Sequence, residues 1–170
     1  TYLISTADFV ACHNPAYVHQ YDMLKGLRKG GTFLLNCLWS KEELEENLPG
    51  SMKRYLAENE INFYTINAVK IGEEIGLGNR INMIMQTAFF ALTKVIPLEE
   101  AIAHLKESII KNYGFMGDDI VEMNNKAVDM GATSFEKIDI PASWATAEIK
   151  NAEEKEVPEF ISKVLAPISR

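Results

Sequence analysis

Three short apolar runs, separated by stretches with helical character, constrain the fold of this chain more than any other feature. They cover residues 8–12, 31–35 and 61–66, and polar residues follow each run. The first two runs are continuous rather than alternating, which is typical of strands covered on both faces. Strands that alternate with helices at this spacing pair in parallel through right-handed crossovers. The sequence therefore predicts the α/β class, with an open parallel sheet.

The first connection between these strands is predicted to be a helix over residues 16–27. Tyr17 and Tyr21 would lie on one stripe of that helix. The glycine pair Gly30-Gly31 follows, and glycine is the residue that most often closes a helix. We therefore expect the second strand to begin at this pair, with Gly31 as its first residue.

The second connection contains a helix start that side-chain chemistry identifies. Ser40 and Glu43 are three positions apart, so the Ser40 hydroxyl can accept the Glu43 amide while the Glu43 carboxylate reaches back. Pro49 then ends this helix and suits the first turn of the next one, which is predicted over residues 51–59.

The second half of the chain is predicted to be helical, so that the whole is a Rossmann-like three-layer open sheet followed by a helical half. Helices are expected over residues 71–95, 98–112 and 119–130. Asp118 is the expected N-cap of the last helix and Gly131 its expected end.

Beyond Pro141 the chain becomes charged and poor in apolar residues. This composition is typical of a linker, which we assign to residues 145–157. The last segment, residues 158–170, contains a short amphipathic piece. An isolated helix of that length would be marginal in water, so we expect this piece to dock on another surface.

Gly76 and Gly78 resemble the start of a nucleotide-binding loop, but the pattern is incomplete. A dinucleotide fingerprint requires a third glycine where Ile81 stands, and it must follow a strand. The residues before Gly76 have helical character instead. We interpret this stretch as a helix interruption rather than a phosphate cradle.

Two cations flank this glycine pair. Lys70 and Arg80 could contact a phosphate group, or they could pair with nearby carboxylates such as Glu73 and Glu74. Both interpretations remain open, and the ligand-binding one makes Lys70 and Arg80 candidate site residues.

The helix after the glycine pair is apolar in almost every direction. Such a helix is either buried inside its own domain or lies between two bodies, and the sequence leaves both open. Asn82 and Gln86, one turn apart, would form its polar side.

Asparagines follow all three predicted strands: Asn14, Asn36 and Asn67. Ligands of open parallel sheets bind beyond the carboxyl ends of the strands, so these amides could line one crevice. Asparagine also suits turns by itself, because its side chain pairs with nearby backbone. His13 has no carboxylate or nucleophile in its sequence context, and no catalytic set is evident.

Composition excludes several classes of partner. The net charge of −7 argues against nucleic acid and anionic membranes. The longest uncharged segment, residues 81–93, is shorter than a membrane-spanning helix, and no signal peptide is visible. Cys12 and Cys37 are the only cysteines, which provides no ligand set for zinc or an iron–sulfur cluster. We expect a reduced, cytoplasmic setting.

Three segments resemble consecutive blocks of the pyruvate:ferredoxin (flavodoxin) oxidoreductase family: "TYLISTADFVACHN", "YDMLKGLRKGGTFLLN" and "NAVKIGEEIGLGNRINMIMQTAFF". The resemblance runs from residue 1 to about residue 144 and points to the gamma-type domain. It implies that strands preceding this domain segment are missing, and that residues 158–170 begin a connector to the next domain. Cys37-Leu38 stands where a serine-proline pair is expected, which weakens any role for that loop.

The resemblance implies a parent enzyme that oxidatively decarboxylates pyruvate to acetyl-CoA and CO2 on thiamine diphosphate with Mg²⁺. Electrons would pass through [4Fe–4S] clusters to ferredoxin or flavodoxin, and the holoenzyme would be a homodimer. None of these cofactors is expected on this fragment, whose partners would be the other domains. The gamma domain is associated with coenzyme A, so Asn14, Asn36, Asn67, Lys70 and Arg80 are the candidate contacts. The alternative is a self-contained Rossmann-like module that binds a nucleotide or a protein.

Overall fold

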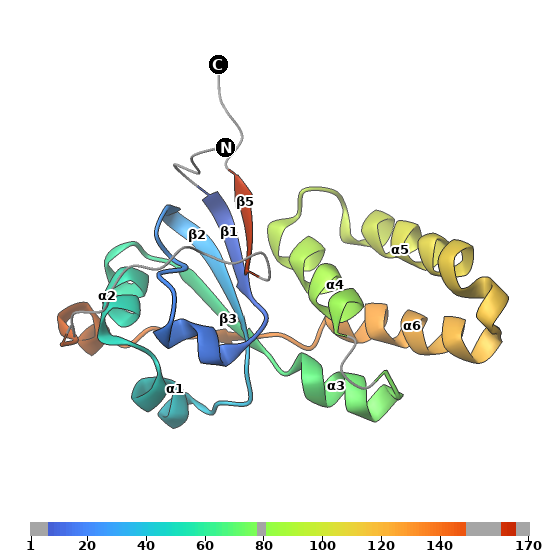
Figure 1. Ribbon diagram of the computed structural model, residues 1–170. Helices are drawn as coiled ribbons and strands as arrows, with labels where there is room; N and C mark the ends of the chain where they lie inside the picture. Colours follow the sequence, from blue (N-terminus) through green and yellow to red (C-terminus); the bar gives the residue numbers. More distant parts are fainter. Residues whose placement is uncertain (1–6, 78–80, 149–160, 166–170) are drawn as a thin grey trace, which may run out of the picture. The chain divides into compact units, whose positions relative to one another are not determined.

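The computed structural model describes residues 7–77, 81–148 and 161–165 (Figure 1). Its described parts form two compact units. The first unit comprises the segments within 1–66 and 136–170, and the second comprises residues 67–135. Arg80 and Gly78 lie outside the described residues.

The first unit is built on a five-stranded sheet with the order β4-β3-β2-β1-β5. Its strands are β1 Ala7–Cys12, β2 Leu27–Asn36, β3 Asn62–Ile66, β4 Glu136–Ile138 and β5 Ile161–Leu165. β1, β2 and β3 are mutually parallel, which confirms the predicted α/β class and the parallel core. The two edge strands, β4 and β5, are antiparallel to their neighbours and were not predicted.

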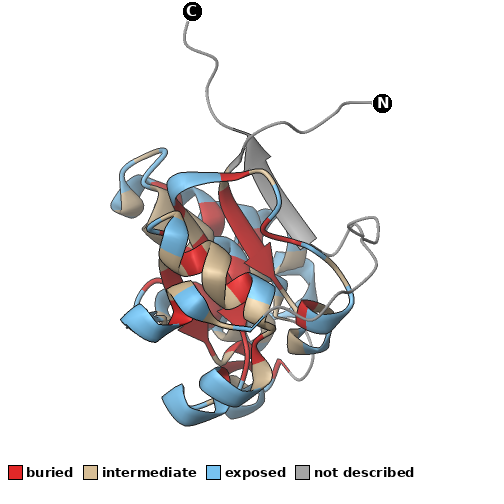
Figure 2. Cartoon of the chain, turned by 90° about the vertical axis from the view of Figure 1, so that its left-hand side faces the viewer, coloured by how far each residue is buried: buried red, intermediate tan, exposed pale blue. Residues whose placement is uncertain are grey.

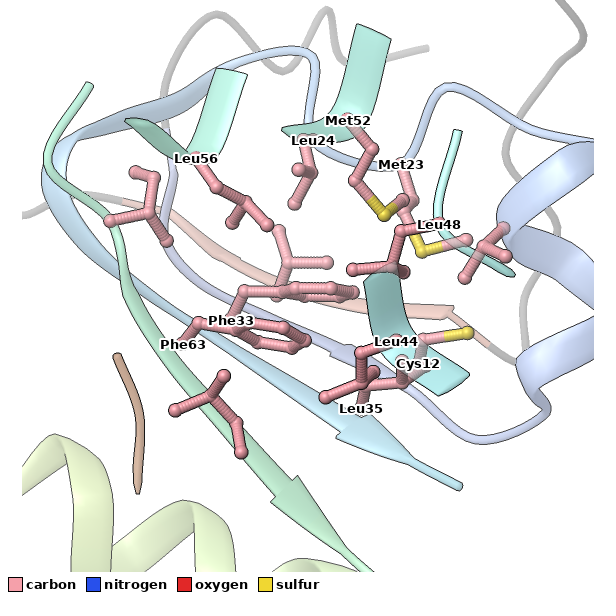
Figure 3. Close-up of a cluster of buried hydrophobic side chains, with 14 of the residues drawn as sticks. Cys12, Met23, Leu24, Phe33, Leu35, Leu44, Leu48, Met52, Leu56 and Phe63 are labelled. Carbon is pink, nitrogen blue, oxygen red and sulfur yellow. The ribbon is translucent and has the colours of Figure 1, made fainter. Parts of the chain in front are cut away.

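One face of this sheet is covered by helices and by turns. The covering elements are η1 Pro15–His19, α1 Lys41–Asn47, α2 Gly50–Glu58 and η3 Ala142–Thr146. Phe33 and Phe63, on adjacent strands, stack with ring centroids 5.4 Å apart and form the centre of the core (Figure 3). Met52 and Leu56 of α2 close the core from the opposite side. In Figure 2 the buried residues gather on the strands, and exposed residues lie on the covering helices.

The prediction of a helix over residues 16–27 is wrong. Only the short 3-10 helix η1 forms, and turns lead from it into β2, which begins at Leu27. Met23 and Leu24 are fully buried in the core. The irregular backbone lets both side chains enter the core, whereas successive side chains of a helix would point in different directions. The glycine pair is likewise not a helix end: Gly30 and Gly31 lie within β2, where its register against β1 shifts.

The predicted helix start at Ser40 is confirmed. The Ser40 hydroxyl accepts the Glu43 amide at 3.3 Å, and the Glu43 carboxylate accepts the Ser40 amide at 3.3 Å. Pro49 is the N-cap of α2, which begins at Gly50, one residue before the predicted start of that helix. Local side-chain chemistry is sufficient to define both helix starts.

The second unit is entirely helical, as predicted. Its elements are α3 Ala68–Ile75, α4 Asn82–Thr93, α5 Leu98–Tyr113, η2 Gly114–Met116 and α6 Asp118–Gly131. α6 packs against α3, α4 and α5. Leu105, Ile109 and Val128 form the buried centre of this unit, and Asn82 and Gln86 are exposed on α4, as predicted for its polar side.

The start of α6 differs from the prediction by one residue, whereas its end at Gly131 agrees with the predicted position. Asp118 is the first residue of α6 rather than its cap, since Gly117 occupies the N-cap position. Gly131 does not terminate the helix by its conformation but belongs to its last turn, where α6 approaches α4 closely. A small residue was therefore selected here by contact with another helix, which the local sequence does not reveal.

The amphipathic piece near the C-terminus is a strand and not a helix. β5 pairs antiparallel with β1, with Ala7 opposite Leu165. This pairing satisfies the backbone groups of the β1 edge, which would otherwise be open. The linker assigned to residues 145–157 falls largely outside the described residues, and the connector at 158–170 stays a prediction.

Candidate functional site

The carboxyl ends of β1 and β2 are joined by a buried amide. The Asn36 side chain is 3% exposed, and its Nδ2 donates to the His13 carbonyl oxygen at 3.0 Å. Because the two strands are parallel, this bond fixes the separation of the two strand ends. Two of the predicted positions, Asn14 and Asn36, thus belong to one edge of one sheet.

Asn14 and Asn67 both act as caps. The Asn14 side chain accepts the Ala16 amide at 3.0 Å and starts η1. The Asn67 side chain accepts the Lys70 amide at 3.1 Å and starts α3. The turn-forming role left open by the sequence is therefore observed at both positions.

The three asparagines are not all in the same unit. Cys37 N–H donates to the Ile66 carbonyl at 3.0 Å, so the ends of β2 and β3 are adjacent within the first unit. Asn67 follows Ile66 directly in the chain but belongs to the second unit, together with Lys70, which is exposed. The predicted crevice therefore has a defined half, formed by Asn14 and Asn36, and its ligand-binding role stays a prediction.

The structure also identifies a residue that sequence reasoning did not use. Leu38, in the loop after β2, is 70% exposed. It lies two positions beyond Asn36, at the same edge of the sheet. The sequence signal that could have identified Leu38 is a large apolar residue two positions after the polar end of a strand.

Gly76 ends α3 and does not form a phosphate cradle. Its φ of +91° is left-handed, and its amide donates to the Glu73 carbonyl at 3.3 Å. Carbonyl groups at the end of a helix carry partial negative charge, which disfavours a phosphate. The predicted helix interruption is confirmed, because α3 and α4 are separate helices.

The titratable groups at the strand ends are neutral near pH 7. Burial lowers the pKa of His13, and burial raises the pKa of the Cys12 thiol to about 12, partly opposed by a hydrogen bond with the backbone of Asn14. Burial also raises the pKa of Cys37. Nucleophilic attack requires the thiolate, so neither thiol is an activated nucleophile near pH 7. Among the described residues, no three acidic, histidine or cysteine side chains gather as a metal site.

A family described as "Pyruvate ferredoxin/flavodoxin oxidoreductase" matches residues 1–134, most of the chain. The chain belongs to this family. A pyruvate:ferredoxin oxidoreductase of Moorella thermoacetica is 54% identical over 99% of this chain, and a pyruvate-flavodoxin oxidoreductase of Enterobacter agglomerans is 52% identical over the same share. This chain spans only 14% of the length of each relative.

One further relative and one solved structure extend the comparison. A mitochondrial pyruvate dehydrogenase [NADP(+)] of Euglena gracilis is 40% identical over 98% of this chain, which spans 9% of it. The crystal structure of pyruvate oxidoreductase subunit PORC from Thermotoga maritima has a TM-score of 0.62 at 16% identity, covering 79% of this chain and 67% of that one. That likeness supports the Rossmann-like α/β fold. In the described part of this family member, none of the helices has the length and apolarity to cross a bilayer.

Proposed function

We propose that this chain is one domain of a larger oxidoreductase that converts pyruvate to acetyl-CoA and CO2, with electrons passed to ferredoxin or flavodoxin. One observation carries the proposal: nearly the whole chain aligns with enzymes named for that reaction, yet it spans 14% of their length. The reaction chemistry would be supplied by thiamine diphosphate with Mg²⁺ and by [4Fe–4S] clusters, held by other segments of a cytoplasmic, homodimeric parent. The role of this domain is structural.

We further infer that the domain has a role in coenzyme A binding, with Asn14, Asn67, Lys70 and Arg80 as contacts and Asn36 as a positioning residue. Lys70 offers an exposed cation that can pair with a phosphate group. Asn36 holds the β1 and β2 ends in place, so its part is positioning rather than direct contact through its bonded amide. The neutral thiols at this edge leave it without a nucleophile of its own.

A segment exchange tests the proposed role of the domain. The aligned segment of the Moorella thermoacetica enzyme is replaced by this chain, and reduction of methyl viologen that depends on pyruvate and coenzyme A is measured anaerobically. We expect activity from the hybrid enzyme and none from the isolated chain. The same hybrid with Phe33→Asp, which places a charge in the core, is the inactive control. Activity from the isolated chain, or an inactive hybrid that is correctly folded, would contradict the proposal.

The coenzyme contact is tested in the active hybrid with Lys70→Ala. The KM for coenzyme A is expected to rise by up to about fivefold, because the loss of an exposed ion pair costs up to roughly 1 kcal/mol. The KM for pyruvate should stay unchanged. Lys111→Ala, another exposed lysine of the second unit, is the matched control. Equal KM values for both variants would refute the contact while leaving the domain role intact.

Tight nucleotide binding by the isolated chain, lost in Gly76→Ala, would favour the self-contained module.

A further inference from the structure

The turn between α5 and α6 presents large apolar side chains to solvent. Ile110 is 60% exposed, Phe115 86% and Met116 49%. Phe115 is the most exposed large apolar side chain in the described part of the protein. We refer to Ile110, Phe115 and Met116 as the η2 knob. Aromatic residues and methionine are enriched at protein interfaces, and a cluster of them on a surface marks a contact site.

The exposure of the η2 knob is imposed by the fold, because the backbone of the turn is fixed at both ends. Gly117 N–H donates to the Gly114 carbonyl at 3.3 Å, and Val121 N–H donates to the Gly117 carbonyl at 3.4 Å. Tyr113, the last residue of α5, packs against the buried centre of the second unit. The backbone of the turn that carries Phe115 is therefore held by hydrogen bonds where it joins α6.

The surroundings of the η2 knob are acidic. Asp118, Asp119 and Glu122 are exposed on the first turns of α6, and Lys111 is the nearest cation along α5. A surface that receives the knob would therefore pair an apolar pocket with lysine or arginine at its rim.

The small size of the η2 knob identifies the kind of partner. Stable complexes between separate proteins bury on the order of 1,200–2,000 Å², far more than three side chains supply. A patch this small is sufficient when its partner is tethered, since a link in the same chain raises the effective concentration to about the millimolar range. The relatives that align with this chain extend far beyond it, so each of them carries further polypeptide in the same chain that could supply a tethered partner.

We propose that the η2 knob docks into an apolar pocket with a basic rim on another domain of the same parent polypeptide. This inference rests on the proposed function only in requiring a parent chain. Phe115 is the anchor of the contact, and the acidic residues of α6 orient it.

Photo-crosslinking in the complete parent polypeptide tests the docking. Phe115→p-benzoylphenylalanine is irradiated and the crosslinked peptides are mapped by mass spectrometry, with Val95→p-benzoylphenylalanine as control. Val95 is also apolar, 59% exposed and in the second unit, but outside the knob. We expect a high yield from position 115 to an apolar segment of the same polypeptide with lysine or arginine nearby. A yield no greater than at position 95, or a crosslink to a second copy or within the two units, would overturn the inference.

A second measurement does not depend on crosslinking chemistry. Phe115→Asp is expected to lower the melting temperature of the parent protein, while Val95→Asp leaves it nearly unchanged; equal shifts would overturn the docking. The viologen assay is run on the same samples. A mapped crosslink in a parent without pyruvate-dependent activity would support the docking and refute the proposed function. Pyruvate-dependent activity without the crosslink would support the proposed function and refute the docking.

Discussion

At the scale of single residues, Gly131 allows the backbones of α6 and α4 to approach each other closely. A Cβ atom placed on this residue would lie 2.5 Å from the Ile84 carbonyl oxygen and 3.0 Å from the Thr87 Cβ. Neither neighbour is a flexible side-chain end, since one is helix backbone and the other a β-branched stem. The crossing of α4 and α6 therefore requires glycine at this position.

We predict that Gly131→Ala destabilises the protein by about 1–3 kcal/mol, the usual cost of overpacking. Gly114→Ala is the matched control, because its Cβ would meet only Ile110 Cγ2, at 3.8 Å. The control should be neutral or stabilising by a few tenths of a kcal/mol. Urea unfolding followed by circular dichroism measures both. Equal stabilities of the two variants would contradict the packing argument.

The Cys12 thiol makes stability depend on alkaline pH. Its pKa is raised from 9.0 to about 12 in the fold, mainly by burial. The unfolded thiol therefore ionises first, and its contribution to stability is complete below about pH 9 and is lost as the pH rises to about 12.

From about pH 8 to about pH 10, the free energy of unfolding should fall by on the order of 1 kcal/mol more in the native protein than in Cys12→Ala. Denaturant titrations at the two pH values measure this difference. Parallel pH profiles of the two proteins would show that the thiol ionises equally in both states.

The asparagines show what local sequence can and cannot predict about the site. Asn14 and Asn67 cap helices that begin directly after them, and that role follows from the residue type. The bond from Asn36 to the His13 carbonyl spans 23 positions and exists only once β1 and β2 are aligned. No local pattern specifies such a bond.

At the scale of elements, η3 is attached to the first unit through Trp144. Its ring is 2% exposed, and its indole N–H donates to the Glu45 carboxylate of α1. Lys53 of α2 lies 3.9 Å from the same carboxylate, and its Nζ is 5.9 Å from the centre of the Trp144 ring. The consecutive helices α1 and α2 thus meet η3, which lies far along the chain, at this indole.

Removing the acceptor should leave a buried N–H unpaired. Glu45→Leu is expected to lower the free energy of unfolding by about 1–3 kcal/mol, whereas Glu45→Gln keeps an acceptor oxygen and should cost less. Glu46→Leu, an exposed neighbour on the same helix, controls for the lost charge. If Glu45→Leu and Glu46→Leu unfold at the same denaturant concentration, the indole bond contributes nothing.

The elements that sequence patterns predict correctly are those defined by their own residues. The strands β1 and β3, the capped start of α1 and the helices of the second unit are of this kind. The helix predicted over residues 16–27 fails because burial of Met23 and Leu24 outweighs local periodicity. β4 is too short and charged to give a strand pattern, and it forms by pairing with β3.

At the scale of the whole molecule, the sequence predicts the family more fully than it predicts the arrangement of the chain in space. Most of the chain matches the family, and this could be predicted from ordered blocks of sequence. The division into two units could not, because β4 returns to the sheet only after the whole helical unit. The second unit is thus inserted in the chain between β3 and β4.

The pairing of β5 with β1 has a consequence for how the domain is carried by a longer chain. Ala7 and Leu165 are register partners, so the polypeptide enters and leaves the sheet at one place. Domains with neighbouring entry and exit points tolerate insertion into other chains, since the flanking segments hardly need to separate. The sheet of the first unit would therefore be joined to a longer chain at one place, and a second contact would be required to fix its orientation.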